Sequence, residues 1–365
     1  MLSPLADAEG VILLSFICIV FFMQTFVDDV GSFPLPQHVE RKSFEEAYRL
    51  ARAWAVEGRD FAENEFLYKN FYEVVVASFR MKLAAGLDVA NYPQHYDICR
   101  QFTETIHKAM EKGTYVVDEK DAIIPEVYVI SREAKRLCKE FGVEKIALRT
   151  CVTGPLELYL KEIGTTPYQD VFLMFAETVR KFAKNSLLNS KRVKTEVVSL
   201  DEPSFGFREV SADKDTIMKV LEKAFDFNGA VRQIHLHSPS RIAEILEVKN
   251  IDVVSIEYAA SPKNLECVSK GSLEKADKKI RVGISRTDID TIMAELHEKG
   301  IAKPQVWEMV EDEHTIKRRF EKAKERFGEK MTFTGPDCGL GGWPTQEAAQ
   351  LLLKRTVNAV KKING

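Results

Sequence analysis

Short apolar segments alternate with longer amphipathic ones along most of the chain. The amphipathic stretches, such as Ser43–Ala85 with a break expected near Gly58 and Asp213–Phe227, have the spacing of helices that cover a sheet. Strands that alternate with crossover helices form a parallel sheet, and eight such units predict a (β/α)8 barrel of the TIM type. The eight predicted strands are Phe26–Phe33, Leu87–Asn91, Lys145–Thr150, Glu196–Leu200, Val231–His237, Val253–Tyr258, Lys279–Ile284 and Lys330–Thr334.

Two further segments have a distinct composition. Tyr115–Ile130 carries two β-rich pieces on either side of a charged centre, which predicts an additional hairpin or loop before the third strand. Glu311–Lys330 is dense in Lys, Arg and Glu, which is typical of a solvated outer helix.

Length and charge narrow the class of protein. A chain of 365 residues accommodates one barrel of about 250 residues with insertions. No Gly/Ser/Pro-rich linker divides it, so we expect a single barrel domain from residue 23 to residue 365. The net charge of −3 offers no basic field for nucleic acid.

The first 22 residues stand apart from this pattern. Val11–Met23 is apolar except for Ser15, but it is shorter than the roughly 20 residues that a membrane span needs, and no basic segment precedes it as in a signal peptide. We expect residues 1–22 to lie outside the barrel, as a non-native start upstream of Met23 or, less favoured, a weak membrane anchor.

The cysteines place the protein in a reducing compartment. The six residues have no CxxC pair and no spacing typical of a disulfide framework, so we expect a cytoplasmic protein with reduced thiols. They are Cys18, Cys99, Cys138, Cys151, Cys267 and Cys338.

Residues of metal-ligand type follow three predicted strands. His235 and His237 are two positions apart on a strand and therefore face the same side. Glu257 ends the sixth strand and Cys338 follows the eighth. In a barrel of this kind the active site lies at the C-terminal strand ends, and two His, one Glu and one Cys are zinc-ligand types. The sequence therefore predicts a metal site.

Two other strand ends carry residues with two interpretations each. Gly31 and Ser32 can bring backbone N–H groups to a small anion such as a substrate carboxylate, or can form an ordinary turn. Asp201 can anchor a substrate ammonium, or can cap a helix that begins at Glu202-Pro203. The residues alone leave both pairs open.

Taken together and in order, these pieces resemble the catalytic C-terminal barrel of cobalamin-independent methionine synthases, in particular the short archaeal core form. The resemblance spans roughly residues 30 to 344. It is carried by Val30–Pro34 (VGSFP), Gly86–Val89 (GLDV), Val152–Pro155 (VTGP), Leu200–Pro203 (LDEP), His235–His237, Ser255–Glu257 (SIE), Pro336–Leu340 (PDCGL) and Gly342–Pro344 (GWP).

The resemblance implies a zinc enzyme that transfers a methyl group to a thiol. The family holds zinc with a His-x-Cys pair, a Glu and a second Cys, so His235, Glu257 and Cys338 match three places. His237 stands where the family has Cys. Histidine is still a competent ligand, and the change makes the formal charge of the zinc site zero instead of −1.

The substrate pocket is expected by the same resemblance. Gly31 and Ser32 would hold the carboxylate of homocysteine, and Asp201 would hold its ammonium in the catalytic site. Gln94 is the nearest match to a second acidic residue of the family. A neutral amide grips an ammonium less strongly, so the acceptor is homocysteine or another small thiol.

A third departure concerns the methyl donor. Folate-using members carry a His beyond the seventh strand that protonates the leaving folate, whereas residues 282–288 here contain none. A methylcobamide or a methylated corrinoid protein needs no such acid and is the expected donor. The alternatives are a methylcorrinoid:coenzyme M-type thiol methyltransferase, a metal-free uroporphyrinogen-decarboxylase-like lyase, and a non-catalytic binding module.

Overall fold

The computed structural model describes residues 24–208 and 210–364. The expected N-terminal extension, residues 1–22, lies outside the described residues. Within the described part, no helix is both long and apolar enough to cross a bilayer.

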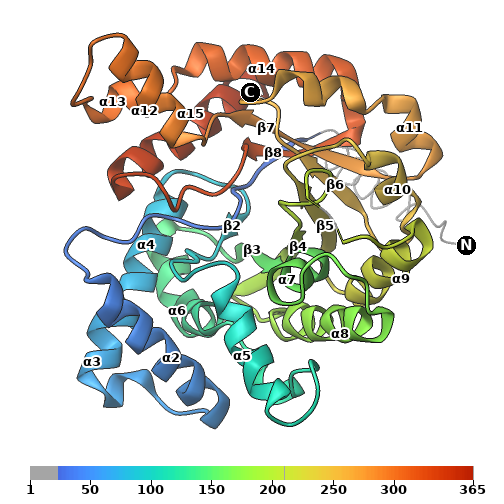
Figure 1. The fold of residues 1–365 in the computed structure, drawn as a ribbon. Coiled ribbons are helices and arrows are strands. Elements are labelled where there is room, and N and C mark those ends of the chain that lie inside the picture. The colour runs from blue at the N-terminus through green and yellow to red at the C-terminus, as the bar shows by residue number, and fades with distance from the viewer. Residues whose placement is uncertain (1–23, 209, 365) are drawn as a thin grey trace, which may run out of the picture.

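Eight parallel strands form a single curled sheet surrounded by helices (Figure 1). Their order is β1-β8-β7-β6-β5-β4-β3-β2, and an isolated parallel bridge from Asp28 to Val89 links the two edge strands. This architecture is of the TIM-barrel type, as predicted. The strands are β1 (Phe26–Val27), β2 (Ala90–Asn91), β3 (Ile146–Thr153), β4 (Val193–Asp201), β5 (Val231–Leu236), β6 (Val253–Ile256), β7 (Lys279–Ser285) and β8 (Met331–Pro336).

Helices cover the outside of the sheet (Figure 1). Those of the first half are α2 (Arg41–Glu57), α3 (Glu65–Leu67), α4 (Glu73–Ala84), α5 (Arg100–Met110), α6 (Pro125–Phe141), α7 (Pro155–Glu162) and α8 (Gln169–Asn185). Those of the second half are α9 (Lys214–Ala224), α10 (Ile242–Glu247), α11 (Lys270–Lys275), α12 (Ile289–Glu298), α13 (Val306–Met309), α14 (Glu313–Phe327) and α15 (Gln346–Asn364).

The hairpin predicted over residues 115–130 does not form. The stretch before Pro125 is a loop with one 3-10 turn, and Pro125 then begins α6. Proline suits the first turn of a helix, where its missing N–H costs no hydrogen bond. The β-branched residues that follow it lie in that helix, with Val127 and Ile130 buried.

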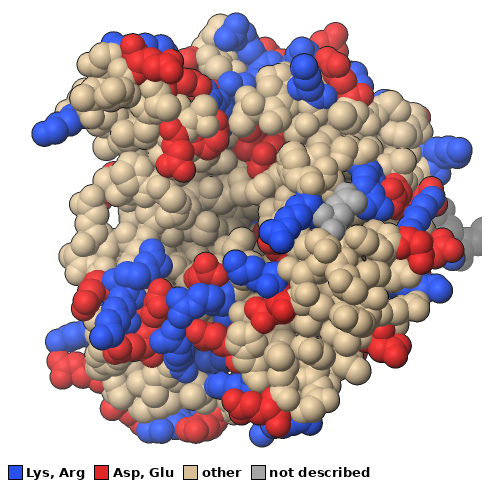
Figure 2. Space-filling model, in the orientation of Figure 1, with Lys and Arg blue, Asp and Glu red and all other residues tan. Residues whose placement is uncertain are grey.

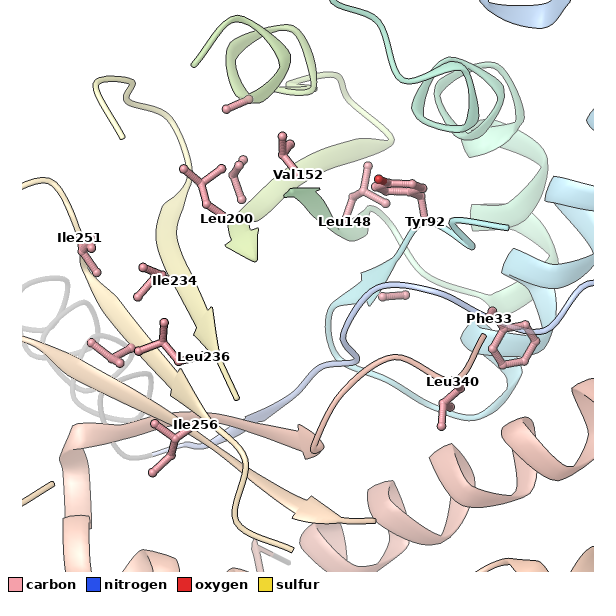
Figure 3. Packing of buried hydrophobic residues seen from close by; sticks show 14 of the residues in the cluster. Phe33, Tyr92, Leu148, Val152, Leu200, Ile234, Leu236, Ile251, Ile256 and Leu340 are labelled. Atoms are coloured by element: carbon pink, nitrogen blue, oxygen red, sulfur yellow. The ribbon is translucent and has the colours of Figure 1, made fainter. Parts of the chain in front are cut away.

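Side chains alternate between the two faces of each strand. Apolar residues such as Leu200, Ile234, Leu236 and Ile256 belong to the large core between the sheet and its helices (Figure 3). The other face points into the barrel. A small apolar cluster there is formed by Val89, Val197, Val253 and Phe333.

Candidate metal centre

The structure brings together the four residues predicted to bind metal. One ligand atom from each of His235, His237, Glu257 and Cys338 lies within 4.8 Å of the others. His237 Nε2 is 3.4 Å from Cys338 Sγ and 3.5 Å from Glu257 Oε1. The four residues come from the C-terminal ends of β5, β6 and β8, where barrels of this type place their sites.

His235 has the features of a ligand that is ready for a cation. Its side chain is buried, and burial holds its pKa well below the usual value, so the ring is neutral. Nδ1 lies 3.1 Å from Ser255 Oγ, whereas the buried Nε2 has no hydrogen-bond partner among the described residues. A buried polar atom without a partner costs about 1–3 kcal/mol, and a metal ion at Nε2 removes this cost.

Two of the other three candidates, Glu257 and Cys338, are acids whose anionic forms are disfavoured by their surroundings. Burial, together with the nearby charge of Asp337, raises the pKa of Glu257 to about 8. Burial and the proximity of Glu257 raise the pKa of the Cys338 thiol well above its usual value. Both acids are therefore disfavoured as anions without a positive partner, and a divalent ion would supply one. The donor set fits zinc.

Asp337 fixes the loops that carry two of these ligands. Its buried carboxylate accepts hydrogen bonds from the backbone N–H groups of Tyr258, Ala259 and Ala260, directly after Glu257. Asp337 also precedes Cys338 in the chain, so one side chain sets the positions of both. Gly283 leaves room for it, because a Cβ there would lie 2.2 Å from Asp337 Oδ1.

A cavity of about 140 Å³ opens beside these clustered residues. Its lining includes every predicted substrate-binding residue, namely Gly31, Ser32, Gln94 and Asp201, together with His235, His237 and Cys338. Gly31 has a φ of +54°, and a Cβ on it would lie 2.9 Å from the Gln94 side chain. Ser32 Oγ accepts a hydrogen bond from the N–H of Gly341, which ties this turn to the loop after Cys338.

The two adjacent carboxylates, Asp201 and Glu202, point to different places. Glu202 accepts hydrogen bonds from the N–H groups of Leu156 and Glu157, in the first turn of α7. Asp201 lines the cavity and accepts one from Ser199 Oγ at 2.7 Å. A turn, not a helix, follows Pro203. The helix cap of this motif is therefore Glu202 on α7, not Asp201 on a following helix.

Gln94 is held in an unusual backbone conformation at the cavity wall. Its φ is +46°, in a region that residues other than Gly and Asn rarely adopt. Only 2% of the residue is exposed. This strained backbone conformation occurs at a residue that lines the cavity, and such strain is common at binding sites.

The cavity continues into an outer chamber that shares Ser32 and Gln94 with it and is also lined by Arg41, Asp97 and Arg100. In Figure 2 the molecule is hollowed near the middle of the view, and charged side chains gather around the hollow more than in its walls.

Sequence reasoning missed several residues behind the ligands. Ser255 contacts His235, and Asp28, Arg149, Gln233 and Arg281 fill the barrel beneath it with no exposure to solvent. A signal was present, since these polar residues occupy inward positions of strands whose alternate residues are apolar. Asp337 belongs to the PDCGL motif, but the motif gave no sign of its contacts with the backbone after Glu257.

Comparisons with known proteins point to the same fold. No family model matches the chain, and no curated protein sequence does. A B12-independent methionine synthase from Shewanella sp. W3-18-1, solved with selenomethionine, is similar in structure, with a TM-score of 0.59 and 14% identity over 93% of this chain and 97% of that one. A homocysteine methyltransferase from Escherichia coli matches less well, with a TM-score of 0.41 and 10% identity over 91% and 95% of the two chains. An endo-β-1,4-mannanase from Thermotoga petrophila has a TM-score of 0.39 and 9% identity over 79% and 73%. At these identities the likeness to the methionine synthase concerns the fold.

Proposed function

We propose that this chain is a zinc-dependent methyltransferase that methylates the sulfur of a small thiol, with homocysteine as acceptor and methionine as product. The observation that carries the proposal is the His235–His237–Glu257–Cys338 cluster, with the orphaned Nε2 of His235, at the wall of a cavity. The similar fold of a methionine synthase supports the choice of reaction.

The four clustered residues would hold zinc, which when bound lowers the pKa of a substrate thiol and supplies a thiolate nucleophile. The remaining residues of the cavity bind and orient the acceptor. Asp201 is placed to pair with an ammonium group, while Gly31 and Ser32 form the turn that would receive a carboxylate. Fixing the acceptor in this way converts much of the entropic barrier of a bimolecular reaction into binding.

Gln94 stands where a second acidic residue would bind the ammonium group of homocysteine more strongly. Its amide can accept a hydrogen bond from an ammonium, but it adds no negative charge, so Asp201 is the only acidic residue in the cavity wall among the described residues. The proposal therefore predicts a lower affinity for homocysteine than a pocket with two carboxylates would have. A thiol without an ammonium, such as coenzyme M, is the competing acceptor.

The donor we propose is a methylcobamide or a methylated corrinoid protein. Residues 286–288, directly after β7, contain no histidine, and Arg286 is paired with Asp288 and Glu295. His95, at the outer chamber, has one ring nitrogen on Phe33 O and the other on Ser78 Oγ, and burial lowers its pKa to about 3. Neither segment supplies a proton donor for a leaving folate nitrogen, and a corrinoid leaves without one.

The test is turnover by the zinc-loaded protein with defined donors and acceptors. Methylcobalamin with homocysteine should give methionine, and methyltetrahydrofolate with homocysteine should give none. Methionine from methyltetrahydrofolate alone would overturn the donor assignment. Faster methylation of coenzyme M than of homocysteine would overturn the acceptor. Uroporphyrinogen decarboxylation without thiol methylation would overturn the reaction class, and absence of any turnover together with absence of bound zinc would favour a binding module.

A further inference from the structure

A layer of polar side chains fills the barrel directly beneath the metal-ligand cluster. It consists of Asp28, Arg149, Gln233 and Arg281, next to or within the odd-numbered strands, and none is exposed to solvent. Asp28 lies between the two arginines, with Oδ2 2.5 Å from Arg149 Nη1 and Oδ1 2.6 Å from Arg281 Nε. Gln233 accepts a further hydrogen bond from Arg149.

Arg281 connects this layer to two of the strands that carry the clustered residues, β8 and β6. Its Nη2 donates to the carbonyl of Pro336 at 2.8 Å, two residues before Cys338 on β8. Its Nη1 lies 3.4 Å from Ser255 Oγ on β6, two residues before Glu257. Gly335 makes this approach feasible, because a Cβ there would lie 2.7 Å from Arg281 Nη2 and 2.0 Å from Asp28 O.

Ser255 extends the connection to β5. Its Oγ is 3.1 Å from His235 Nδ1, and both residues are buried. A hydroxyl oxygen has two lone pairs, so it can accept from Arg281 and from His235 at once. In that arrangement the proton of the neutral ring lies on Nδ1, and the lone pair lies on Nε2, the atom without a partner among the described residues.

We propose that Ser255, held by Arg281 and Asp28, is a positioning residue that fixes the tautomer and ring orientation of His235 for metal binding at Nε2. The inference rests on the proposed function, since it concerns the ion that the cluster would hold. Ser255 would support the metal site through His235 and would not itself bind the metal.

The physical reason is that a histidine ligand needs its lone pair on the coordinating nitrogen. Without an acceptor at Nδ1, the neutral ring is free to place its proton on either nitrogen and to rotate about its bond to Cβ. Loss of such an outer hydrogen bond typically costs about 10- to 100-fold in metal affinity. Asp28 holds the guanidinium of Arg281 in place, with Oδ1 2.6 Å from Nε, so the group that contacts Ser255 has a fixed orientation.

The experiment compares zinc binding by three variants of the full chain. Ser255→Ala removes the acceptor at Nδ1, and Ser255→Thr retains a hydroxyl. Ser285→Ala is the matched control, because Ser285 is equally buried on the neighbouring strand β7 but its Oγ contacts Thr356 in α15. Zinc affinity would be measured against a chromophoric chelator. The visible spectrum of the cobalt(II)-loaded protein reports the ligand field, and thermal melting reports folding.

We expect Ser255→Ala to bind zinc about 10- to 100-fold more weakly and to alter the cobalt spectrum. Ser255→Thr and Ser285→Ala should retain the affinity and spectrum of the unmodified chain. If Ser255→Ala does not fold, Ser255→Thr provides the test. A folded Ser255→Thr that has lost the native cobalt spectrum would overturn the inference.

Two results would contradict the inference while leaving the proposed function intact. These are native zinc affinity and spectrum in Ser255→Ala, and an equal loss in Ser285→Ala. If the unmodified chain binds no zinc, the proposed function fails and the inference fails with it.

Discussion

Replacing Asp201 with Asn separates substrate binding from structural support at the LDEP motif. Asp201 lines the cavity, and its carboxylate accepts a hydrogen bond from Ser199 Oγ. Burial raises the pKa of this carboxyl, while the nearby Arg149 guanidinium opposes the rise. Asp201→Asn keeps the shape and the acceptor oxygen but removes the negative charge that would pair with an ammonium.

The expected magnitude lies between two limits. An exposed ion pair contributes about 0–1 kcal/mol, and breaking a fully buried one costs about 3–5 kcal/mol. Asp201 is partly exposed toward the cavity, and Arg149 already offsets some of its charge. We therefore expect a loss of about 2–3 kcal/mol, which corresponds to a rise of roughly 30- to 150-fold in the KM for homocysteine. Zinc content and melting temperature should remain unchanged.

Glu202→Gln is the matched control at the adjacent residue. The Glu202 carboxylate accepts from two backbone N–H groups of α7, at 2.9 and 2.7 Å. An amide offers one acceptor oxygen and turns its NH2 toward the second N–H, so the variant should lose about 1–3 kcal/mol of stability. Its KM should be that of the unmodified chain. An unchanged KM in Asp201→Asn, or an equal rise in both variants, would refute the role of Asp201 in the pocket.

Three further predictions test the site and its support. Cys338→Ala should remove zinc by elemental analysis, whereas the exposed Cys267→Ala should retain it, and equal zinc in both would contradict the ligand assignment. Gly154→Ala should lower the melting temperature, because its Cβ would lie 2.1 Å from Glu202 Oε1. The control Gly271→Ala should not lower it, because a Cβ there meets no atom within 4 Å. Equal melting temperatures of the two variants would contradict this packing. Burial raises the pKa of Glu126 from 4.5 to about 8, so the native state binds more protons than the unfolded state between these values, and stability falls by up to about 1.4 kcal/mol per pH unit as pH rises. Glu257, whose pKa is also raised to about 8, contributes a similar loss in both proteins. Urea unfolding at pH 6, 7 and 8 should therefore show a steeper loss in the unmodified chain than in Glu126→Gln, and parallel curves would contradict the prediction.

The barrel could be predicted because a short apolar segment followed by an amphipathic one recurs along the chain, which gives eight predicted strands. His235 and His237, two positions apart at the end of β5, were predicted to face the same side, and the structure brings them into one cluster while Leu236 between them lies in the core. Strand limits were less predictable. The first run was predicted to reach Phe33, but β1 is Phe26–Val27, since beyond it the chain pairs with Val89 through a single bridge.

The segment predicted to form a hairpin or loop forms a loop and then a helix, because its later apolar positions have helical spacing. Val127, Ile130, Ala134 and Leu137 are buried on α6, and their spacing of three and four residues is that of a helix face. The β-branched content of the segment favoured strands, and tertiary packing overrode this preference.

The division of labour between Asp201 and Glu202 could not be predicted from the sequence, because it depends on how close two distant motifs come. Gly154 in the VTGP motif and Glu202 in the LDEP motif are 48 positions apart, yet the missing Cβ of the first provides the space for the second. The reason for a glycine at position 154 becomes clear only when the fold brings Glu202 against it.

The buried charges of this barrel form a set that a divalent ion would complete. Beneath the cavity, the two positive charges of Arg149 and Arg281 face the negative charges of Asp28 and Asp201, so this part balances without a metal. Above it, Glu257 and a Cys338 thiolate would carry two negative charges, and the two histidines carry none in their neutral forms. A divalent cation would neutralise these two charges, while the carboxylate of the nearby Asp337 is held by three backbone N–H groups. A cysteine at position 237 would leave one negative charge uncompensated in the same enclosure. An unbalanced buried charge is costly. A neutral His237 therefore suits a site in which Arg149 and Arg281 already face Asp28 and Asp201 and cannot compensate a further negative charge.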